Sequence, residues 1–429
     1  MSFADTYLRR YASARIKDLI DPDPGLAVIV VIPVYNEPDL GMAIDSLLAA
    51  DPPGCSWEII AVVNEPQHCP VSHSDQNLQT IRQLEDYIAT INRNDLSVHF
   101  INPEPLPVRK AGPGLARKIG MDEALRRFNK IGRPDGIIAS YDADTLCSAN
   151  YLKGLFSFYE SHPDAAGCTV YFEHPAGDEN FDSMHHQQGI IQYELYLRYF
   201  RWSLAWMGFP YSCYSLGSAF SVRADRYAIA GGMGLQQAGE DFYFLQKCLP
   251  LGNFWEMNTV SVFPSPRFSD RVVFGTGPRI EKYTGEREEF IGVYQFKLFE
   301  ASRPLFEFVN KLKDITSQIN AVEEITRGLD YGIGERTREL GWPEKIERAI
   351  NESAGINSFR RRFYQEINLL QVIRLFNLME FNGFPKKPVA GEYRKFLNKL
   401  SVKVYPSDPG ELLHFARGKD RNRGDFQIV

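Results

Sequence analysis

A short apolar run, residues 26–34 (LAVIVVIPV), constrains the fold of this chain most strongly. The run is mostly β-branched and does not alternate with polar residues, which is typical of a strand buried on both faces of a parallel sheet. Similar runs follow at 57–63, 97–101 and 136–141, and segments with helical periodicity separate them. Strands that alternate with helices predict βαβ units and an α/β fold with an open, mostly parallel sheet.

The pattern changes near residue 285, and from there the apolar spacing is helical only. We therefore expect an α/β domain over 1–285, in which residues 1–25 form an N-terminal helical extension. An all-α C-terminal domain is expected over 286–429. Such a helical domain offers a surface for oligomer formation.

The composition narrows the class of partner and the compartment. A formal net charge of −6 argues against nucleic acid, because phosphate binding needs a basic face. The longest uncharged run, 202–222, contains proline and glycines and is a poor membrane span, so no transmembrane segment is expected. No apolar leader is visible at the N-terminus, and the six cysteines form no C-x-x-C pair. Reduced thiols and a cytoplasmic location are the expectation.

Two polar clusters follow predicted strands. Residues 33–37 (PVYNE) follow the first strand without the G-x-G-x-x-G of a dinucleotide site. Asp142 and Asp144 follow the strand at 136–141, and two carboxylates this close repel each other unless a cation lies between them. Mg²⁺ or Mn²⁺, bound together with a substrate diphosphate, answers this need. The alternative is a pair of helix-capping residues before the next helix.

A third acidic cluster, Glu240 and Asp241, opens a predicted helix. Acidic residues there ordinarily complement the helix dipole, and the pair taken alone favours capping.

Five motifs in sequence resemble the family 2 glycosyltransferases and their relatives of GT-A fold, over roughly residues 26–265. The motifs are 31–37 (VIPVYNE), 110–117 (KAGPGLAR), 142–144 (DAD), 217–223 (GSAFSVR) with 231–232 (GG), and 239–241 (GED). Nothing in the helical C-terminal part contributes to this resemblance.

The resemblance implies a Rossmann-like GT-A domain that moves a sugar from a nucleotide-diphosphate donor to an acceptor hydroxyl. It implies contacts to the donor nucleotide from Pro33, Tyr35, Glu37, Asn64, Lys110, Arg117 and Asp142. Many relatives have an aspartate where Asn64 stands, and this leaves the nucleotide open, because an amide can donate as well as accept hydrogen bonds.

At the reacting end, the resemblance implies that Asp142 and Asp144 hold Mg²⁺ or Mn²⁺, that Asp241 is the general base and that Glu240 helps to orient the acceptor. The divalent ion would stabilise the departing diphosphate as a Lewis acid. The hypothesis is a metal-dependent inverting glycosyltransferase. The alternatives are a retaining transferase with a small acidic acceptor such as glycerate, and a non-catalytic nucleotide-sugar-binding protein.

A last cluster, residues 264–277, lies outside the motifs of the resemblance. Arg267 and Arg271, together with Thr276, can grip the donor diphosphate or an acidic acceptor. The alternative is a surface loop whose arginines pair with acidic residues of the chain. The pair His185–His186 is expected to be solvated. The acceptor itself, whether sugar, glycan, lipid or small acid, is left open.

Overall fold

The computed structural model describes residues 2–13, 19–103, 105–107, 111–175, 181–236, 239–268, 276–286, 288–313, 315–402 and 405–429. The chain divides into two compact units. Unit 1 consists of Met1–Ile190, Tyr214–Gly285 and Arg417–Val429, and unit 2 of Ile191–Cys213 and Glu286–Ala416. The compact units and the predicted domains both have a boundary after residue 285. They differ in two segments, because 191–213 belongs to the helical unit and 417–429 to the sheet unit.

Unit 1 is built on a nine-stranded sheet. Its strands are β1 (Leu26–Val34), β2 (Ser56–Val63), β3 (Leu96–Ile101), β4 (Ile137–Ser140), β5 (Thr145–Cys147), β6 (Gly167–Phe172), β7 (Phe220–Arg223), β8 (Phe254–Pro264) and β11 (Phe426–Gln427). Their order is β11-β8-β6-β7-β4-β1-β2-β3, and β5 pairs with β8. The pairs β1–β2, β1–β4, β2–β3 and β6–β8 are parallel, whereas β7 is antiparallel to both of its neighbours. The predicted mostly parallel open sheet is confirmed.

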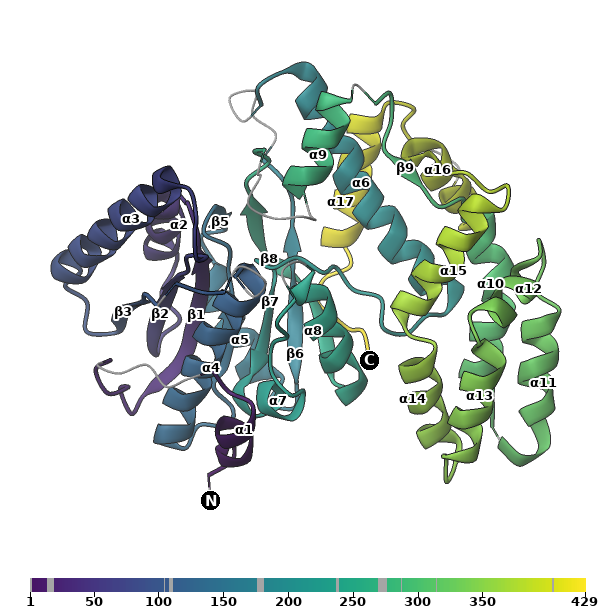
Figure 1. Ribbon diagram of the computed structural model, residues 1–429, viewed down its shortest axis with the longest axis horizontal. Helices are drawn as coiled ribbons and strands as arrows, with labels where there is room; N and C mark the ends of the chain where they lie inside the picture. Colours follow the sequence, from purple (N-terminus) through teal and green to yellow (C-terminus); the bar gives the residue numbers. More distant parts are fainter. Residues whose placement is uncertain are drawn as a thin grey trace. The chain divides into compact units, whose positions relative to one another are not determined.

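The helices of unit 1 are α1 (Asp5–Arg10), α2 (Leu40–Ala49), α3 (Val71–Thr90), α4 (Pro113–Ile131), α5 (Tyr151–Ser161), α7 (Ala224–Ile229), α8 (Glu240–Cys248), with a 3-10 turn at Leu249–Leu251, and α9 (Thr276–Gly285). Of these, α2, α3, α4, α5 and α7 contact strands of the sheet (Figure 1). Helix α4 packs on β1, all nine residues of which are buried. A Cβ on Gly120 of α4 would lie 2.4 Å from Cγ1 of Val31, so glycine lets the helix approach the strand closely.

The register of the parallel strands brings their carboxyl ends to one edge of the sheet. Val31 pairs with Ser140 of β4, and Pro33 pairs with Val62 of β2. Pro33 lies beyond the part of β1 that pairs with β4, where its missing N–H costs no ladder bond. Ligands of open α/β sheets bind at this edge, and the loops after β1, β2 and β4 all begin there.

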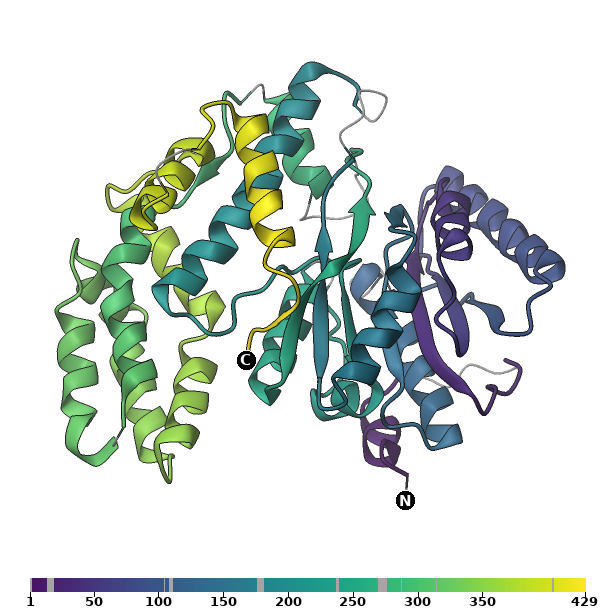
Figure 2. The ribbon, with the colours of Figure 1, turned by 180° about the vertical axis from the view of Figure 1, so that it is seen from behind.

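The C-terminal residues complete the sheet of unit 1 (Figure 2). Strand β11 pairs antiparallel with the edge strand β8. The Tyr214 hydroxyl donates to Oδ2 of the fully buried Asp420 at 2.8 Å. Asp425 accepts the N–H groups of Asn258 and Thr259 at 2.7 and 3.0 Å. The sequence offered no strand pattern for this tail, and its place in the sheet was not predicted.

Unit 2 is helical, as the sequence predicts for the C-terminal part. It contains α10 (Phe296–Lys311), α11 (Ile315–Arg327), α12 (Ile333–Glu339), α13 (Trp342–Asn351), α14 (Ile356–Glu366), α15 (Leu369–Phe381), α16 (Val389–Lys399) and a small sheet of β9 (Gly292–Val293) and β10 (Lys387–Pro388). Helices α6 (Met184–Met207) and α17 (Pro409–Arg421) contribute residues to both units. The unit 2 core is aromatic; the rings of Phe299 and Phe376, for example, meet edge to face at 4.8 Å. In the described part of the chain, a helix with the length and apolar character of a membrane span is absent.

Candidate active site

The loop after β1 carries a buried glutamate. Glu37 is 1% exposed, and its Oε1 accepts the backbone N–H of Asp39 at 2.9 Å. Tyr35, one of the predicted nucleotide contacts, shares a hydrogen bond of 2.8 Å between its hydroxyl and Nδ1 of His73 on α3. The predicted site residues Pro33, Tyr35 and Glu37 therefore all lie at the carboxyl edge of the sheet.

Asn64 follows β2 at the same edge. Its backbone N–H and its side-chain Nδ2 both donate to the carbonyl oxygen of Val34 at 2.9 Å. The amide is thereby oriented with Oδ1 away from that carbonyl. Oδ1 is buried and has no hydrogen-bond partner among the described residues. A buried acceptor without a donor is unfavourable, which makes this atom a candidate contact for a ligand.

The acidic pair after β4 is half-exposed and faces two arginines. The side chains of Asp142 and Asp144 are 33% and 24% exposed. Oδ1 of Asp142 accepts from Arg117 at 2.9 Å, and Oδ2 of Asp144 lies 3.1 Å from Nη2 of Arg267. A cation does sit beside each carboxylate, as like-charge repulsion requires, and in this structure it is a guanidinium.

Arg117 of α4 connects the acidic pair to the start of α8. The residue is 2% exposed, and its Nη2 donates both to Asp142 and, at 3.1 Å, to Oε1 of Glu240. Its Nη1 donates to the Ser140 hydroxyl at 2.6 Å and to the Gly217 carbonyl at 3.0 Å. A Cβ on Gly217 would lie 2.4 Å from Nη2 of Arg117, so this position tolerates only glycine while the guanidinium keeps its place.

The charge of Arg117 is secured by its partners. Burial alone would lower its pKa, but the carboxylates of Asp142, Glu240 and Asp241 outweigh burial and raise the pKa above its ordinary value. Arg117, which was predicted to contact the nucleotide-diphosphate donor, thus forms hydrogen bonds and ion pairs with protein groups. Its geometry suits a residue that positions carboxylates.

Asp241 has the pKa of a base that works near neutrality. Burial and the nearby charge of Glu240 raise the pKa of Asp241 to about 7, while Arg117 and the Phe242 N–H act in the opposite direction. Oδ1 of Asp241 accepts that Phe242 N–H at 2.7 Å. A carboxylate that only caps a helix is ordinarily ionised at low pH, and the raised pKa of Asp241 contrasts with this.

Arg267, three residues beyond β8, joins two loops of the site. Its guanidinium pairs with Glu37, with Asp39 at 2.5 Å and with Asp144. Burial would lower the pKa of Arg267, and the hydrogen bond to Glu37 and the nearby carboxylates of Asp144 and Asp39 raise it above its ordinary value. The sequence analysis did not predict Asp39 as a site residue. The only signal in the sequence was its position next to the 33–37 motif.

The structure describes three of the predicted site residues in part or not at all. Lys110 and Arg271 lie outside the described residues. Thr276 is the first residue of α9, and the described part of it is the backbone.

The expectation that His185–His186 is solvated is wrong. His186 is 1% exposed, its Nε2–H donates to the Pro266 carbonyl at 2.8 Å, and its ring stacks on Phe268 at 4.3 Å. His185 stacks on Tyr283 at 4.4 Å. Adjacent residues on a helix point in different directions, and here both directions lead into packed structure. His186 therefore contacts the residue on either side of Arg267.

A divalent ion fits the donor set at Asp142 and Asp144 in part. Mg²⁺ and Mn²⁺ accept one or two carboxylates plus substrate phosphate oxygens and water. Within the described residues, no group of three or more His, Cys, Asp and Glu side chains is arranged to hold a metal. A metal at this edge must therefore take its remaining ligands from the substrate and from water, and it must share the carboxylates with two arginines.

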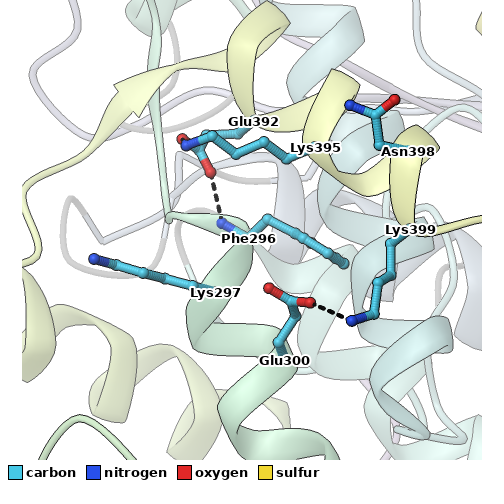
Figure 3. A pocket seen from close by; sticks show the side chains of 7 residues that line it. All are labelled: Phe296, Lys297, Glu300, Glu392, Lys395, Asn398 and Lys399. Atoms are coloured by element: carbon cyan, nitrogen blue, oxygen red, sulfur yellow. Dashed lines mark hydrogen bonds and ion pairs between the residues drawn. The ribbon is translucent and has the colours of Figure 1, made fainter.

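A pocket of about 340 Å³ lies elsewhere, within unit 2 (Figure 3). It lies between α10 and α16 and is lined by Phe296, Lys297, Glu300, Glu392, Lys395, Asn398 and Lys399. Glu300 pairs with Lys399 at 2.9 Å, and Glu392 pairs with Lys395 at 2.7 Å. Its charged walls are largely paired with each other, and no predicted site residue contributes to it.

Comparisons with known proteins found one matching family and several similar solved structures. Residues 29–223 match the model of a family described as glycosyl transferase family 2. The crystal structure of S. aureus TarS 1–349 in complex with UDP-GlcNAc is similar at 15% identity and a TM-score of 0.41, over 79% of this chain and 91% of that one. GalNAc-T7 with UDP, GalNAc and Mn²⁺ is similar at 16% identity and a TM-score of 0.37, over 72% and 58%. At TM-scores below 0.5, neither similarity bears on the function of this chain. No curated protein matches the chain by sequence.

Proposed function

We propose that this chain, a glycosyltransferase whose residues 29–223 belong to glycosyl transferase family 2, moves a sugar from a nucleotide-diphosphate donor to an acceptor hydroxyl with inversion at the sugar carbon. One observation carries the proposal. Asp142 and Glu240 bond to the same nitrogen of Arg117, so the acidic pair after β4 and the base candidate Asp241 belong to one charge network.

The nucleobase contacts Asn64 in this proposal. Because Nδ2 already donates to Val34, the buried Oδ1 is the atom that needs a partner. Uracil and thymine present a ring N–H at position 3, whereas the same ring nitrogen of cytosine only accepts, so that cytosine can donate only through its exocyclic amino group. A uridine or thymidine diphosphate therefore suits this site better than a cytidine diphosphate.

The chemical step uses Asp241. The acceptor hydroxyl oxygen attacks the sugar carbon while the bond from that carbon to the diphosphate oxygen breaks, and the hydroxyl proton passes to the Asp241 carboxylate. A positioned base of this kind contributes about 10²- to 10⁴-fold. A single displacement inverts the anomeric centre. Asp142 and Asp144 would hold Mg²⁺ or Mn²⁺ with the diphosphate, and the ion would supply Lewis-acid stabilisation of the leaving charge.

Arg117 acts as a positioning residue. It fixes the orientation of Asp142 through Oδ1 and holds Glu240 beside the base, and it stays charged at every physiological pH. Glu240, at 4% exposure, raises the pKa of Asp241 and thereby keeps the base matched to neutral solution.

The test of the base is Asp241→Asn. We expect donor binding, measured by isothermal titration calorimetry with UDP, to stay within about threefold of the wild type while transfer falls by at least 10²-fold. Asp225→Asn is the matched control, because this aspartate of α7 also has a raised pKa, caused by burial, but belongs to no part of the site. Wild-type turnover in Asp241→Asn would refute the assignment. NMR of the product's anomeric proton separates inversion from retention.

The test of the donor compares UDP with CDP in the wild type and in Asn64→Ala. The wild type should bind UDP more tightly, and the substitution should reduce the preference by about three- to tenfold, the effect of one neutral hydrogen bond. Equal affinity for UDP and CDP in the wild type would contradict the role of Asn64.

A further inference from the structure

We propose that Arg267 is the resident counter-ion of Asp144, and that a divalent ion binds Asp144 only when this guanidinium moves away. The inference rests on the proposed function, since it takes a metal-assisted donor site as given. It adds a device that this chain's own residues form: metal binding and arginine release are one event.

The contacts of Arg267 already perform the task of a bound cation. Nη2 faces Glu37 and Asp144, and Nη1 faces Asp39 at 2.5 Å. These carboxylates come from the loops after β1 and β4, so the guanidinium holds two parts of the site together. The three carboxylates that meet at this guanidinium are also oxygen ligands of the kind that a divalent ion prefers.

The arrangement is also incomplete for Arg267 itself. Its Nε is buried without a hydrogen-bond partner among the described residues. A buried donor of this kind disfavours the present state relative to one in which an acceptor is available. The oxygens of a diphosphate are such acceptors, and a guanidinium binds them through its forked donors.

The backbone around Arg267 is fixed while its side chain remains partly exposed. The His186 ring donates a 2.8 Å hydrogen bond to the Pro266 carbonyl and stacks on the Phe268 ring. A shift of Pro266 would break this hydrogen bond. The Arg267 side chain is 23% exposed. Release of Asp144 therefore requires rotation of the side chain and weakens the ion pairs that Arg267 makes, a cost that new acceptors must offset.

Competition for one carboxylate has a measurable consequence. A divalent ion and a guanidinium cannot both approach Oδ2 of Asp144 without repulsion, so Arg267 weakens metal binding in the absence of donor. When the diphosphate is present, the displaced guanidinium gains new acceptors, and the penalty falls. Metal and donor then bind cooperatively.

The experiment measures Mn²⁺ binding to the full-length protein without nucleotide, by the electron paramagnetic resonance signal of free Mn²⁺. Arg267→Gln should bind Mn²⁺ about tenfold more tightly than the wild type, because a nearby positive charge is removed. Arg267→Lys keeps the charge but loses the fork, and its affinity should lie between the two. Arg133→Gln is the matched control; Arg133 pairs with Asp135 at 2.9 Å before β4 and should leave Mn²⁺ affinity unchanged.

Asp144→Asn separates this inference from the proposed function. If Asp144→Asn abolishes Mn²⁺ binding while Arg267→Gln leaves it unchanged or weakens it, the counter-ion role is refuted and the metal site stands. If the wild type binds no Mn²⁺ even with UDP present, the metal part of the proposed function fails and the counter-ion role fails with it. If Arg267→Gln does not fold, as judged by circular dichroism, Arg267→Lys decides: affinity equal to or weaker than the wild type overturns the proposal.

Discussion

Asp241 lies under opposing influences, and their balance sets its chemistry. Burial and the charge of Glu240 favour the neutral carboxyl, whereas Arg117 and the Phe242 N–H favour the carboxylate. The resulting pKa of about 7 means that small changes in the surroundings alter the protonation state at physiological pH. We therefore expect the same group to link pH to turnover and to stability.

Turnover should rise with pH as Asp241 ionises. With a pKa of about 7, kcat/KM should increase about tenfold per pH unit below pH ~6 and level off above pH ~8. Glu240→Gln removes the neighbouring negative charge and should shift this rise to lower pH. A pH profile that is flat between pH ~5 and ~8 would contradict the role of Asp241 as the base.

Stability should show the opposite trend. The unfolded chain loses the Asp241 proton near pH ~4, and the folded chain retains it up to about pH 7. Between these values the folded state binds the additional proton, so this group makes stability fall as pH rises. The melting temperature of Asp241→Asn minus that of the wild type should increase between pH ~5 and ~8. If the melting temperatures of the two proteins change with pH in the same way, the pKa of Asp241 is not raised.

Helix α4 links the core to the site. Close contact between Gly120 and Val31 seats the helix against β1, and Arg117, one turn earlier, then reaches Asp142 and Glu240. The Gly217 backbone closes the other side of the guanidinium. The position of the charge network thus depends on apolar packing between one helix and one strand.

Gly217→Ala tests this dependence. A Cβ there would lie 2.4 Å from Nη2 of Arg117 and 3.0 Å from Oδ1 of Asp142, so the guanidinium must shift. We expect kcat/KM to fall by about 10²-fold, as misplacement of about 1 Å commonly causes. Gly418→Ala of α17 is the control, because its Cβ would meet nothing within 4 Å. The control should retain activity and gain about 0.5–1 kcal/mol of stability; equal activity of the two variants would refute the argument.

The C-terminal tail contributes to the stability of unit 1. The tail at 417–429 pairs with the edge strand β8 and satisfies polar groups of that strand, and Phe254 donates its N–H to the Val429 carbonyl at 3.0 Å. Such edge strands are otherwise open to unwanted pairing. The tail thus protects the side of the sheet opposite to β3.

Deletion of residues 417–429 should destabilise unit 1. The loss of the β11 pairing and of the buried Tyr214–Asp420 bond should lower the melting temperature by several degrees, at about 1–3 kcal/mol for a buried group left unpaired. Asp420→Asn keeps the chain length and should have a smaller effect in the same direction. An unchanged melting temperature after deletion would show that the tail contributes nothing.

Several elements were predictable because their signals are local. The uninterrupted apolar run at 26–34 is β1 to the residue, and the change to helical periodicity near 285 matches a boundary of the compact units. Helix α3 begins at Val71, and its first turns are polar and show no periodicity from which this start could be predicted. Strand β11 has only two residues, too few for any pattern.

The sequence by itself determined the α/β class, the strands at 26–34, 57–63, 97–101 and 136–141, and the acidic residues at strand ends, because apolar runs and strand-end motifs are properties of adjacent residues. Only the tertiary structure decided which charges meet. Arg117 contacts Glu240 across 123 positions, and Arg267 contacts Glu37 across 230. Such contacts depend on how closely α4 packs and where the loop after β8 returns, and no local pattern encodes either.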